Sequence, residues 1–332
     1  MVKTVYHEEW LNREKNRKDL TYYEQQKIAF ISRHMEKFSP QKSTRINHED
    51  LECVQTLSGI FANRKAVEQY TRSLMPGSFG IWHRIRLETP YYSNGDEPIY
   101  HVNPVLKERN WKIPMVRGSA WKGAFFHAAL QQLKANLRQE NMESFFKVYL
   151  QIYRIFGTGS QEFRAVEQVV KRVTDSGWHH DEFVKVLLRY ALLELGLNLR
   201  IKKGGTQSVA EQLMNHIFRS FDDDQRFVVH RGRVVFYPTY FDQVSLEVIN
   251  PGNRKRRIAI FYETVPPETF GIFQLFYIPY DGILLEEDLL CKQANEDHEF
   301  LQMLFQKVCR HGIGAKSKIW GKFKLEDESD GL

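Results

Sequence analysis

Cysteine is scarce in this chain. The 332 residues include only Cys53, Cys291 and Cys309, which lie far apart and form neither a CxxC pair nor a close set with histidine. An odd number of widely spaced cysteines argues against a disulfide framework and against a structural zinc site. We therefore predict no metal and no other cofactor.

Long apolar runs are also missing. No stretch reaches the roughly 18 apolar residues that a membrane-spanning helix requires, and the opening sequence MVKTVYHEEWLNREKNRKDL is charged throughout. It has no apolar segment of the kind that forms the centre of a signal peptide. We expect a cytoplasmic protein that makes no contact with a membrane.

The composition is that of an ordinary globular protein, with 42% hydrophobic and 27% charged residues. Lysine and arginine exceed the acidic residues, which gives a net charge of +6 and a pI of about 9.0. This balance favours a polyanionic partner such as a nucleic acid, although a mild basic excess is also common in proteins that bind nothing acidic.

Two regions differ in pattern. Residues 1–75 are rich in Lys, Glu and Gln and carry apolar residues at helical spacing, which predicts a helical N-terminal extension. Met75-Pro76-Gly77-Ser78 marks the boundary, because proline disfavours helix in the residue before it and glycine permits a turn. Residues 76–332 form the second predicted domain, which includes a helical insertion at about 137–230.

The second domain alternates between strand and helix signals. Period-two alternation over 79–87 predicts a half-buried strand. A long polar loop at 89–114 follows, and then a helix over 120–133 with Ser119 at or near its N-cap. After the insertion, Val, Ile, Phe and Tyr dominate four predicted strands, a last helix and a short closing strand. The strands cover 234–240, 244–249, 258–264 and 270–278, and the helix covers about 297–311.

Without the insertions, this order is strand, helix, strands, helix, strand. The predicted fold class is therefore α+β, with the βαββαβ core of the ferredoxin-like, or RRM-like, fold. A basic connector, which includes Arg254, Lys255 and Arg256, separates two of its strands and is a candidate RNA contact.

The first candidate binding motif is IPMVRGSAWKGA at 113–124, a turn that enters a helix. Backbone N–H groups at a helix start and the helix dipole both favour an anion, and nearby cations add to that attraction. A capped helix with two solvated cations is the structural alternative. The candidate RNA-binding residues here are Arg117, Gly118, Ser119, Trp121 and Lys122.

The second candidate motif is the glycine-rich stretch GIGAKSKIWGKF at 312–323. Its glycines permit close backbone approach and its lysines supply charge, which suits a phosphate backbone. The spacing fits neither GxxxxGK[ST] nor GxGxxG, so no nucleoside triphosphate site is implied. A basic turn before a final strand is the structural alternative. The candidate residues are Gly312, Gly314, Lys316, Lys318 and Lys322.

Together, these two motifs resemble the RAMP superfamily of CRISPR proteins. The family's first helix opens with a sequence like IPGSSLKGALR, which is similar to 113–125 here, and its last helix leads to a glycine-rich loop. Two departures stand out: Val116-Arg117 replaces the proline-glycine pair, and Trp121 replaces a leucine. The final motif is most similar to the type III-B backbone subunit near the 3′ end of the CRISPR RNA. The resemblance implies CRISPR RNA, target RNA and other type III effector subunits as partners.

The same resemblance speaks against catalysis. Family members that cut target RNA carry an aspartate immediately before an Asn-Pro-Val element, and the matching position here is Val102. Valine can neither bind a metal nor move a proton. Asp96 and His101 lie in the same loop and are the fallback catalytic candidates. The clusters at 179–182 and 222–224 lack the spacing of zinc and EF-hand sites.

The leading hypothesis is therefore a non-catalytic CRISPR RNA-binding and assembly subunit of a type III effector that targets foreign RNA. One alternative is a metal-dependent backbone subunit that cleaves target RNA, which depends on Asp96 or His101. The other is an endoribonuclease that processes CRISPR RNA, a class that generally uses an early histidine and lacks the GSxxKG-type element. Because that element is recognisable at 118–123, we favour the binding subunit.

Overall fold

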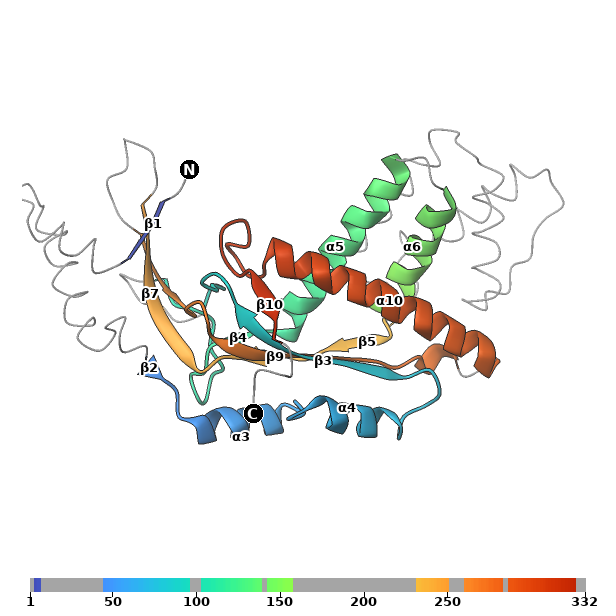
Figure 1. Ribbon diagram of the computed structural model, residues 1–332, viewed down its shortest axis with the longest axis horizontal. Helices are drawn as coiled ribbons and strands as arrows, with labels where there is room; N and C mark the ends of the chain where they lie inside the picture. The colour runs from blue at the N-terminus through green and yellow to red at the C-terminus, as the bar shows by residue number, and fades with distance from the viewer. Residues whose placement is uncertain are drawn as a thin grey trace, which may run out of the picture. The chain divides into compact units, whose positions relative to one another are not determined.

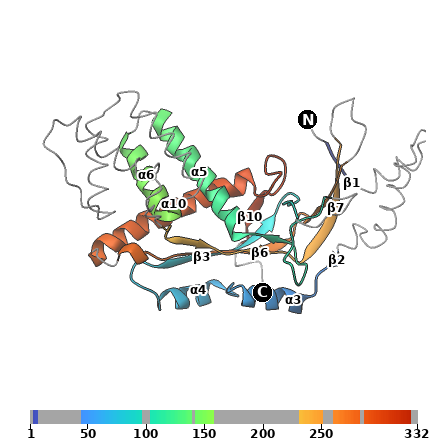
Figure 2. The same cartoon turned by 180° about the vertical axis from the view of Figure 1, so that it is seen from behind.

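The structure of the chain is a computed structural model (Figures 1 and 2). It describes residues 3–6, 44–95, 103–138, 142–157, 231–250, 260–282 and 286–326. These residues belong to two compact units. The first contains Met1–Ala124, Val235–Ile278 and Leu301–Leu332, and the second contains Phe125–Val234 and Pro279–Phe300. The two domains predicted from the sequence, with a boundary at residue 75, stay a prediction.

The first unit is centred on an antiparallel sheet. Its strands lie in the order β10-β3-β9-β5, with bounds Phe323–Leu325, Phe79–Leu87, Phe270–Tyr277 and Val234–Phe236. Strands β3 and β9 pair from Phe79 opposite Tyr277 to Arg86 opposite Phe270. The last strand, β10, pairs antiparallel with the first, β3. The predicted mixed α and β fold is confirmed, and the paired strands of this sheet are antiparallel.

Helices cover both faces of this sheet. Helices α3 (His48–Leu57) and α4 (Arg64–Thr71) lie along one face (Figure 1). Val67 of α4 packs with Trp82 and Phe276 in one buried cluster. The predicted alternation of β3 holds at Ile85 and Leu87, which are buried, and at Arg84, which is exposed. Trp82, on the other face, is buried as well because α4 packs against it.

The opposite face of the sheet carries an aromatic core. Phe305, in the C-terminal part of α10 (Glu287–His311), lies 4.7 Å from Phe273 and 5.8 Å from Phe323 between ring centroids. All three side chains are fully buried. Burial of such side chains stabilises the fold by roughly 1.5–3 kcal/mol each, before the entropy of ordering them is counted.

A second sheet is built around β7 (Gln243–Asn250). Strand β8 (Ile260–Thr264) and strand β1 (Lys3–Tyr6) both pair antiparallel with it, and β2 (Thr44–Arg45) pairs with its first residues. The region before residue 75 was predicted to be helical, so β1 and β2 correct that prediction in part. Strands this short gain most of their stability from the β7 edge that they pair with.

The predicted strand over 234–240 is interrupted. Strand β5 ends at Phe236, and β6 (Thr239–Tyr240) pairs instead with β4 (Met115–Val116). Between them, Tyr237 still donates its amide to the Gln274 carbonyl at 3.0 Å. Pro238 has no N–H to donate, which ends the pairing with β9.

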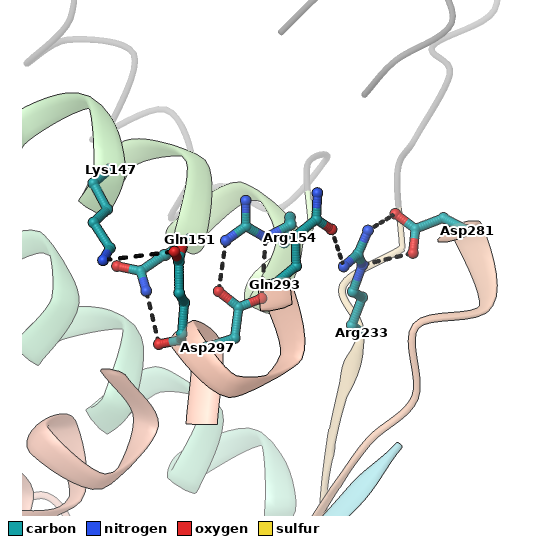
Figure 3. A network of polar contacts seen from close by, with 8 residues as sticks. Lys147, Gln151, Arg154, Arg233, Asp281, Gln293 and Asp297 are labelled. Carbon is teal, nitrogen blue, oxygen red and sulfur yellow. Dashed lines mark hydrogen bonds and ion pairs between the residues drawn. The ribbon is translucent and has the colours of Figure 1, made fainter. Parts of the chain in front are cut away.

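The second unit contains most of α5 (Gly118–Arg138), all of α6 (Met142–Phe156) and the first half of α10. Arg154 of α6 donates from Nε and Nη2 to the Asp297 carboxylate of α10, at 3.0 and 2.7 Å (Figure 3). We predicted that the last helix starts near Asp297, but it starts ten residues earlier. From the sequence, Asp297 is a suitable polar residue for a helix start. In the structure it lies inside the helix, where it is buried and pairs with Arg154.

A second ion pair, between buried Arg233 and Asp281 at the surface, lies beside the first. Arg233 donates from Nε and Nη2 to the Asp281 carboxylate, at 2.6 and 3.0 Å, and from Nη1 to Gln293 Oε1 at 3.0 Å (Figure 3). Gly157 and Arg231 form an antiparallel bridge. Gly157 and Arg231, the residues on either side of 158–230 in the chain, therefore lie next to each other in this unit.

Candidate nucleic-acid interface

Tyr91 lies between the two basic motifs. A Cβ built on Gly314 would come within 2.9 Å of the Tyr91 ring, so this glycine is in close contact with it. On the other side, the Tyr91 hydroxyl donates to the carbonyl of Met115 at 3.2 Å. Burial raises the pKa of Tyr91, while a hydrogen bond with Ser93 and the nearby Arg117 cation oppose that rise. The fold thus places the glycine loop and the start of α5 on either side of one buried tyrosine.

The first motif forms the start of helix α5. Arg117 acts as its N-cap, since its carbonyl accepts from the amides of Ala120 and Trp121 at 2.9 and 3.1 Å. Ser119, predicted at or near the N-cap, is the second residue of the helix and is exposed, as is Arg117. Lys122 is half-buried. The first amides of a helix have no acceptor within it, and its dipole attracts an anion. This end of α5 therefore combines two cations with the positive end of a helix.

The packing of α5 against the sheet requires glycine at position 118. A Cβ at this position would lie 2.3 Å from the carbonyl oxygen of Phe236, at the end of β5. Such a distance is shorter than any packed contact, so only glycine lets α5 begin this close to the sheet. This requirement exists whether or not an RNA binds.

Trp121 is a core residue, which corrects its prediction as an RNA contact. Its side chain has an exposed fraction of 0%. The ring meets Phe273 and Phe323 edge to face, at 4.8 and 5.4 Å between centroids, and Nε1 donates to Thr239 Oγ1 at 3.0 Å. The motif placed Trp121 correctly on α5, but the sequence does not show which face of this helix meets the sheet.

The glycines of the second motif serve the protein's own backbone. Gly312, Gly314 and Gly321 have φ angles of +82°, +91° and +75°, a region that L-residues with a side chain rarely adopt. A Cβ on Gly314 would lie 2.3 Å from the carbonyl oxygen of Tyr92, and one on Gly312 2.6 Å from that of Trp320. These close approaches are within the chain, and the predicted contact of Gly312 and Gly314 with phosphates stays a prediction.

The lysines of this loop, the red segment between α10 and β10 in Figure 1, lie on a braced turn. The amides of Ile319 and Trp320 donate to the Lys316 carbonyl at 2.9 and 2.8 Å, which closes one helical turn. Trp320 packs edge to face on Tyr262 at 5.6 Å, and the Lys316 ammonium lies 5.2 Å above the Tyr262 ring. Lys318 is exposed. The turn therefore presents its cations from a fixed backbone.

Two amides of this loop bond to the protein's own backbone. The amides of Ile313 and Ala315 donate to the carbonyls of Gly321 and Tyr92, at 3.0 and 2.9 Å. These bonds tie the glycine-rich loop to itself and to the loop that carries Tyr92.

A profile of the RAMP superfamily matches residues 84–319, which is well over half of the chain and includes the first motif and most of the second. The chain belongs to the RAMP superfamily. The comparison with curated protein sequences gives no match.

Two solved structures resemble this RAMP protein. One is a chain of the type III-B Cmr-beta complex bound to cognate target RNA, with 12% identity, a TM-score of 0.42, and coverage of 94% of this chain and 77% of that chain. The other is Cmr6 from Pyrococcus furiosus, with 16% identity, a TM-score of 0.31, and coverage of 76% of this chain and 100% of that chain.

Several predicted site residues lie outside the described residues of this RAMP protein. They are Asp96, His101, Arg254, Lys255 and Arg256, together with Val102 and the clusters at 179–182 and 222–224. Within the described residues, no group of three or more His, Cys, Asp or Glu side chains is placed to hold a metal ion. No described helix is both long and apolar enough to cross a membrane. RNA contacts at all predicted site residues other than Trp121 stay predictions.

Sequence reasoning missed Tyr91 and Glu247. Tyr91 sits in a loop predicted to be polar, and only the fold shows that it joins the two motifs. Glu247 of β7 lies opposite Tyr6 and Tyr262 in the second sheet. Burial raises the pKa of Glu247 to about 7. Its signal in the sequence is a single charge within the apolar strand SLEVI.

Proposed function

We propose that this RAMP protein is a non-catalytic subunit of a type III CRISPR effector, which binds CRISPR RNA and assembles with other subunits of the complex. The observation that carries the proposal is the position of the two basic motifs on either side of Tyr91. Membership of the RAMP superfamily adds support, because the matched residues include the first motif and most of the second.

We further propose that the core is ferredoxin-like. Along the chain, the elements of the central sheet follow the order β3, α5, β5, β9, α10 and β10. In the sheet order β10-β3-β9-β5, the first strand along the chain, β3, lies between the fourth, β10, and the third, β9. The second strand, β5, pairs with β9 at the edge. This arrangement supports a βαββαβ core.

RNA binding in this proposal acts mainly on phosphates. Arg117 and Lys122 at the start of α5 contact the RNA backbone, and so do the lysines of the glycine-rich loop, Lys316, Lys318 and Lys322. Arg254, Lys255 and Arg256 extend this contact. Lysine, arginine and main-chain amides contact phosphates without reading bases, so one subunit can hold any guide sequence.

The proposed partners are CRISPR RNA, target RNA and neighbouring type III subunits. The similarity of the final motif to a type III-B backbone subunit supports a contact near the 3′ end of the CRISPR RNA. The absence of catalysis is part of the proposal and rests on Val102, where cleaving members of the family carry aspartate.

The test is an RNA titration with matched charge changes. The variant with Arg117→Glu and Lys122→Glu is compared with one that carries Lys65→Glu and Arg72→Glu. The second variant makes the same change in net charge on α4 and its C-cap, over the other face of the sheet. The first variant is expected to bind fluorescein-labelled CRISPR RNA more weakly than wild type, by the same factor for two unrelated guides. The α4 variant is expected to bind nearly as well as wild type.

The salt dependence gives a second readout. Each lost phosphate contact lowers the slope of log affinity against log salt by about 0.7 for single-stranded RNA. The α5 variant should therefore show a slope that is smaller by roughly 1.4. Wild-type affinity in the α5 variant, with circular dichroism unchanged, would remove this site from the proposal.

A further inference from the structure

The loop at 107–114 is a rigid hairpin. Lys107 and Pro114 form an antiparallel bridge at its base. Within it, Glu108 donates its amide to the Ile113 carbonyl at 2.8 Å and accepts the Lys112 amide on its own carbonyl at 3.0 Å. Four residues at the tip are therefore held by hydrogen bonds at both ends.

The side chain of Glu108 also braces the tip from inside. Its Oε2 accepts from the amides of Asn110 and Trp111, at 2.7 and 2.8 Å. Lys112 has a φ of +56°, a conformation that costs a non-glycine residue about 1 kcal/mol or more. Local strain of this kind persists only where the surrounding bonds impose it, so the tip has a defined shape.

This braced tip presents an aromatic ring to solvent. Trp111 is 36% exposed, one of the few large hydrophobic side chains that is not covered in the described part of the chain. Arg109, Asn110 and Lys112 beside it are exposed as well. Tryptophan is more often covered by other residues, so an exposed tryptophan on a rigid tip favours a binding role.

The charges around Trp111 favour a nucleic acid over a protein partner. The one carboxylate of the tip, Glu108, is engaged with the backbone amides of its own loop. The next cation along the chain, Lys107, is paired with Glu263 at 2.6 Å. Arg109 and Lys112 are both exposed, and they flank the ring along the chain. An exposed ring between two cations suits an RNA base with its adjoining phosphates.

We propose that Trp111 stacks on an unpaired base of bound RNA, while Arg109 and Lys112 contact the phosphates on either side of that base. This inference rests on the proposed RNA-binding function and adds to it a contact with a base. Stacking on a ring tolerates every base, so the contact strengthens binding without selecting a sequence.

The experiment compares two ligands with the full chain. One is a fluorescein-labelled oligouridine, and the other is an abasic oligomer of equal length that has the same ribose-phosphate backbone. Trp111→Ala is expected to weaken oligouridine binding roughly tenfold and to leave abasic binding unchanged. Trp111→Phe should lose less, because phenylalanine retains a ring. Phe270→Ala is the matched control, since Phe270 is equally exposed at 38% on β9.

Other results separate the tip from the wider function. If Trp111→Ala binds both ligands as wild type does while Arg117→Glu with Lys122→Glu binds neither well, the tip proposal fails and the proposed function stands. If wild type binds neither ligand at low salt, both fail. If Trp111→Ala keeps RNA binding but loses association with another effector subunit, the tip is a protein contact and the proposal is overturned.

Discussion

The carbonyl oxygen of Tyr92 accepts the amide of Ala315 at 2.9 Å, which joins the loop after β3 to the glycine-rich loop before β10. The two loops are separated by most of the chain. The contact between the two loops depends on Gly314, whose backbone lies against both Tyr91 and Tyr92. The lysines at 316 and 318 are therefore positioned by a contact that reaches across the sequence.

Substitution of Gly314 should harm folding more than binding. In Gly314→Ala, the new Cβ would lie 2.3 Å from the Tyr92 carbonyl oxygen, at a φ of +91°. We expect a loss of about 3 kcal/mol or more in the free energy of unfolding. Urea denaturation followed by circular dichroism measures this loss.

Gly123→Ala is the matched control for that substitution. Gly123 lies inside α5, and a Cβ there would meet nothing within 4 Å. Alanine has the higher helix propensity, so this variant should gain roughly 0.5–1 kcal/mol. Equal stability of the two variants would show that the glycine loop does not need its close contact with Tyr92.

The buried ion pair in the second unit should be sensitive to the loss of either partner. Asp297→Ala leaves the Arg154 guanidinium without its bidentate acceptor, in a position where the two side chains are 6% and 0% exposed. We expect a cost of about 3–5 kcal/mol in thermal or urea unfolding. The pair is drawn in Figure 3.

Glu296→Ala provides the comparison one residue away. Glu296 pairs with Lys147 at 3.9 Å, with the side chains 33% and 55% exposed. Solvent screens such a pair, so the variant should change stability by less than about 1 kcal/mol. A similar cost in both variants would mean that Asp297 contributes no more than an ordinary surface charge.

Stability should fall as pH rises through the range in which Glu247 titrates. Burial raises the pKa of Glu247 to about 7, so the folded state holds a proton that the unfolded state releases near the ordinary glutamate pKa. Between these two values, the folded state binds more protons, and rising pH therefore favours unfolding. Above about pH 7 the full penalty is present.

Glu247→Gln removes this titration. We expect the melting temperature of the variant to exceed that of wild type by more at pH 8 than at pH 5, at constant ionic strength. Glu263→Gln is the contrasting variant: Glu263 is equally buried but accepts from Lys107 and from the Val105 amide. It should be destabilised at pH 8. If the melting temperatures of Glu247→Gln and wild type differ by the same amount at pH 5 and at pH 8, the role assigned to Glu247 is refuted.

The absence of catalysis can be tested from two directions in an assembled complex. Metal-assisted cleavage needs a carboxylate or an equivalent group held near the scissile phosphate. Asp96→Ala with His101→Ala should leave the number and spacing of target RNA cuts unchanged on a sequencing gel. Val102→Asp supplies the missing carboxylate and would add a cut if the loop geometry is competent. Loss of one specific cut in the alanine variant would identify this subunit as a nuclease.

Local sequence pattern predicted some elements closely. Strand β3 spans Phe79–Leu87 as predicted, because its alternation is regular and Gly77, with a φ of +77°, provides the turn before it. The predicted polar loop at 89–114 was harder to interpret. Isolated bridges, Tyr91 opposite Val265 and Asn103 opposite Tyr262, pin its described residues to β8 and the residue that follows it. Pairing of this kind depends on residues far away in the sequence.

By itself, the sequence determined where strands and helices alternate, where its two basic motifs lie, and which family it resembles. These features depend on residues close together in the chain, through side-chain period, backbone preference and charge. Tertiary structure alone decided that Trp121 is buried, that Asp297 is an interior partner of Arg154, and that the two motifs meet at Tyr91. Burial and contact depend on which distant surfaces pack together, and no local period or charge pattern records that choice.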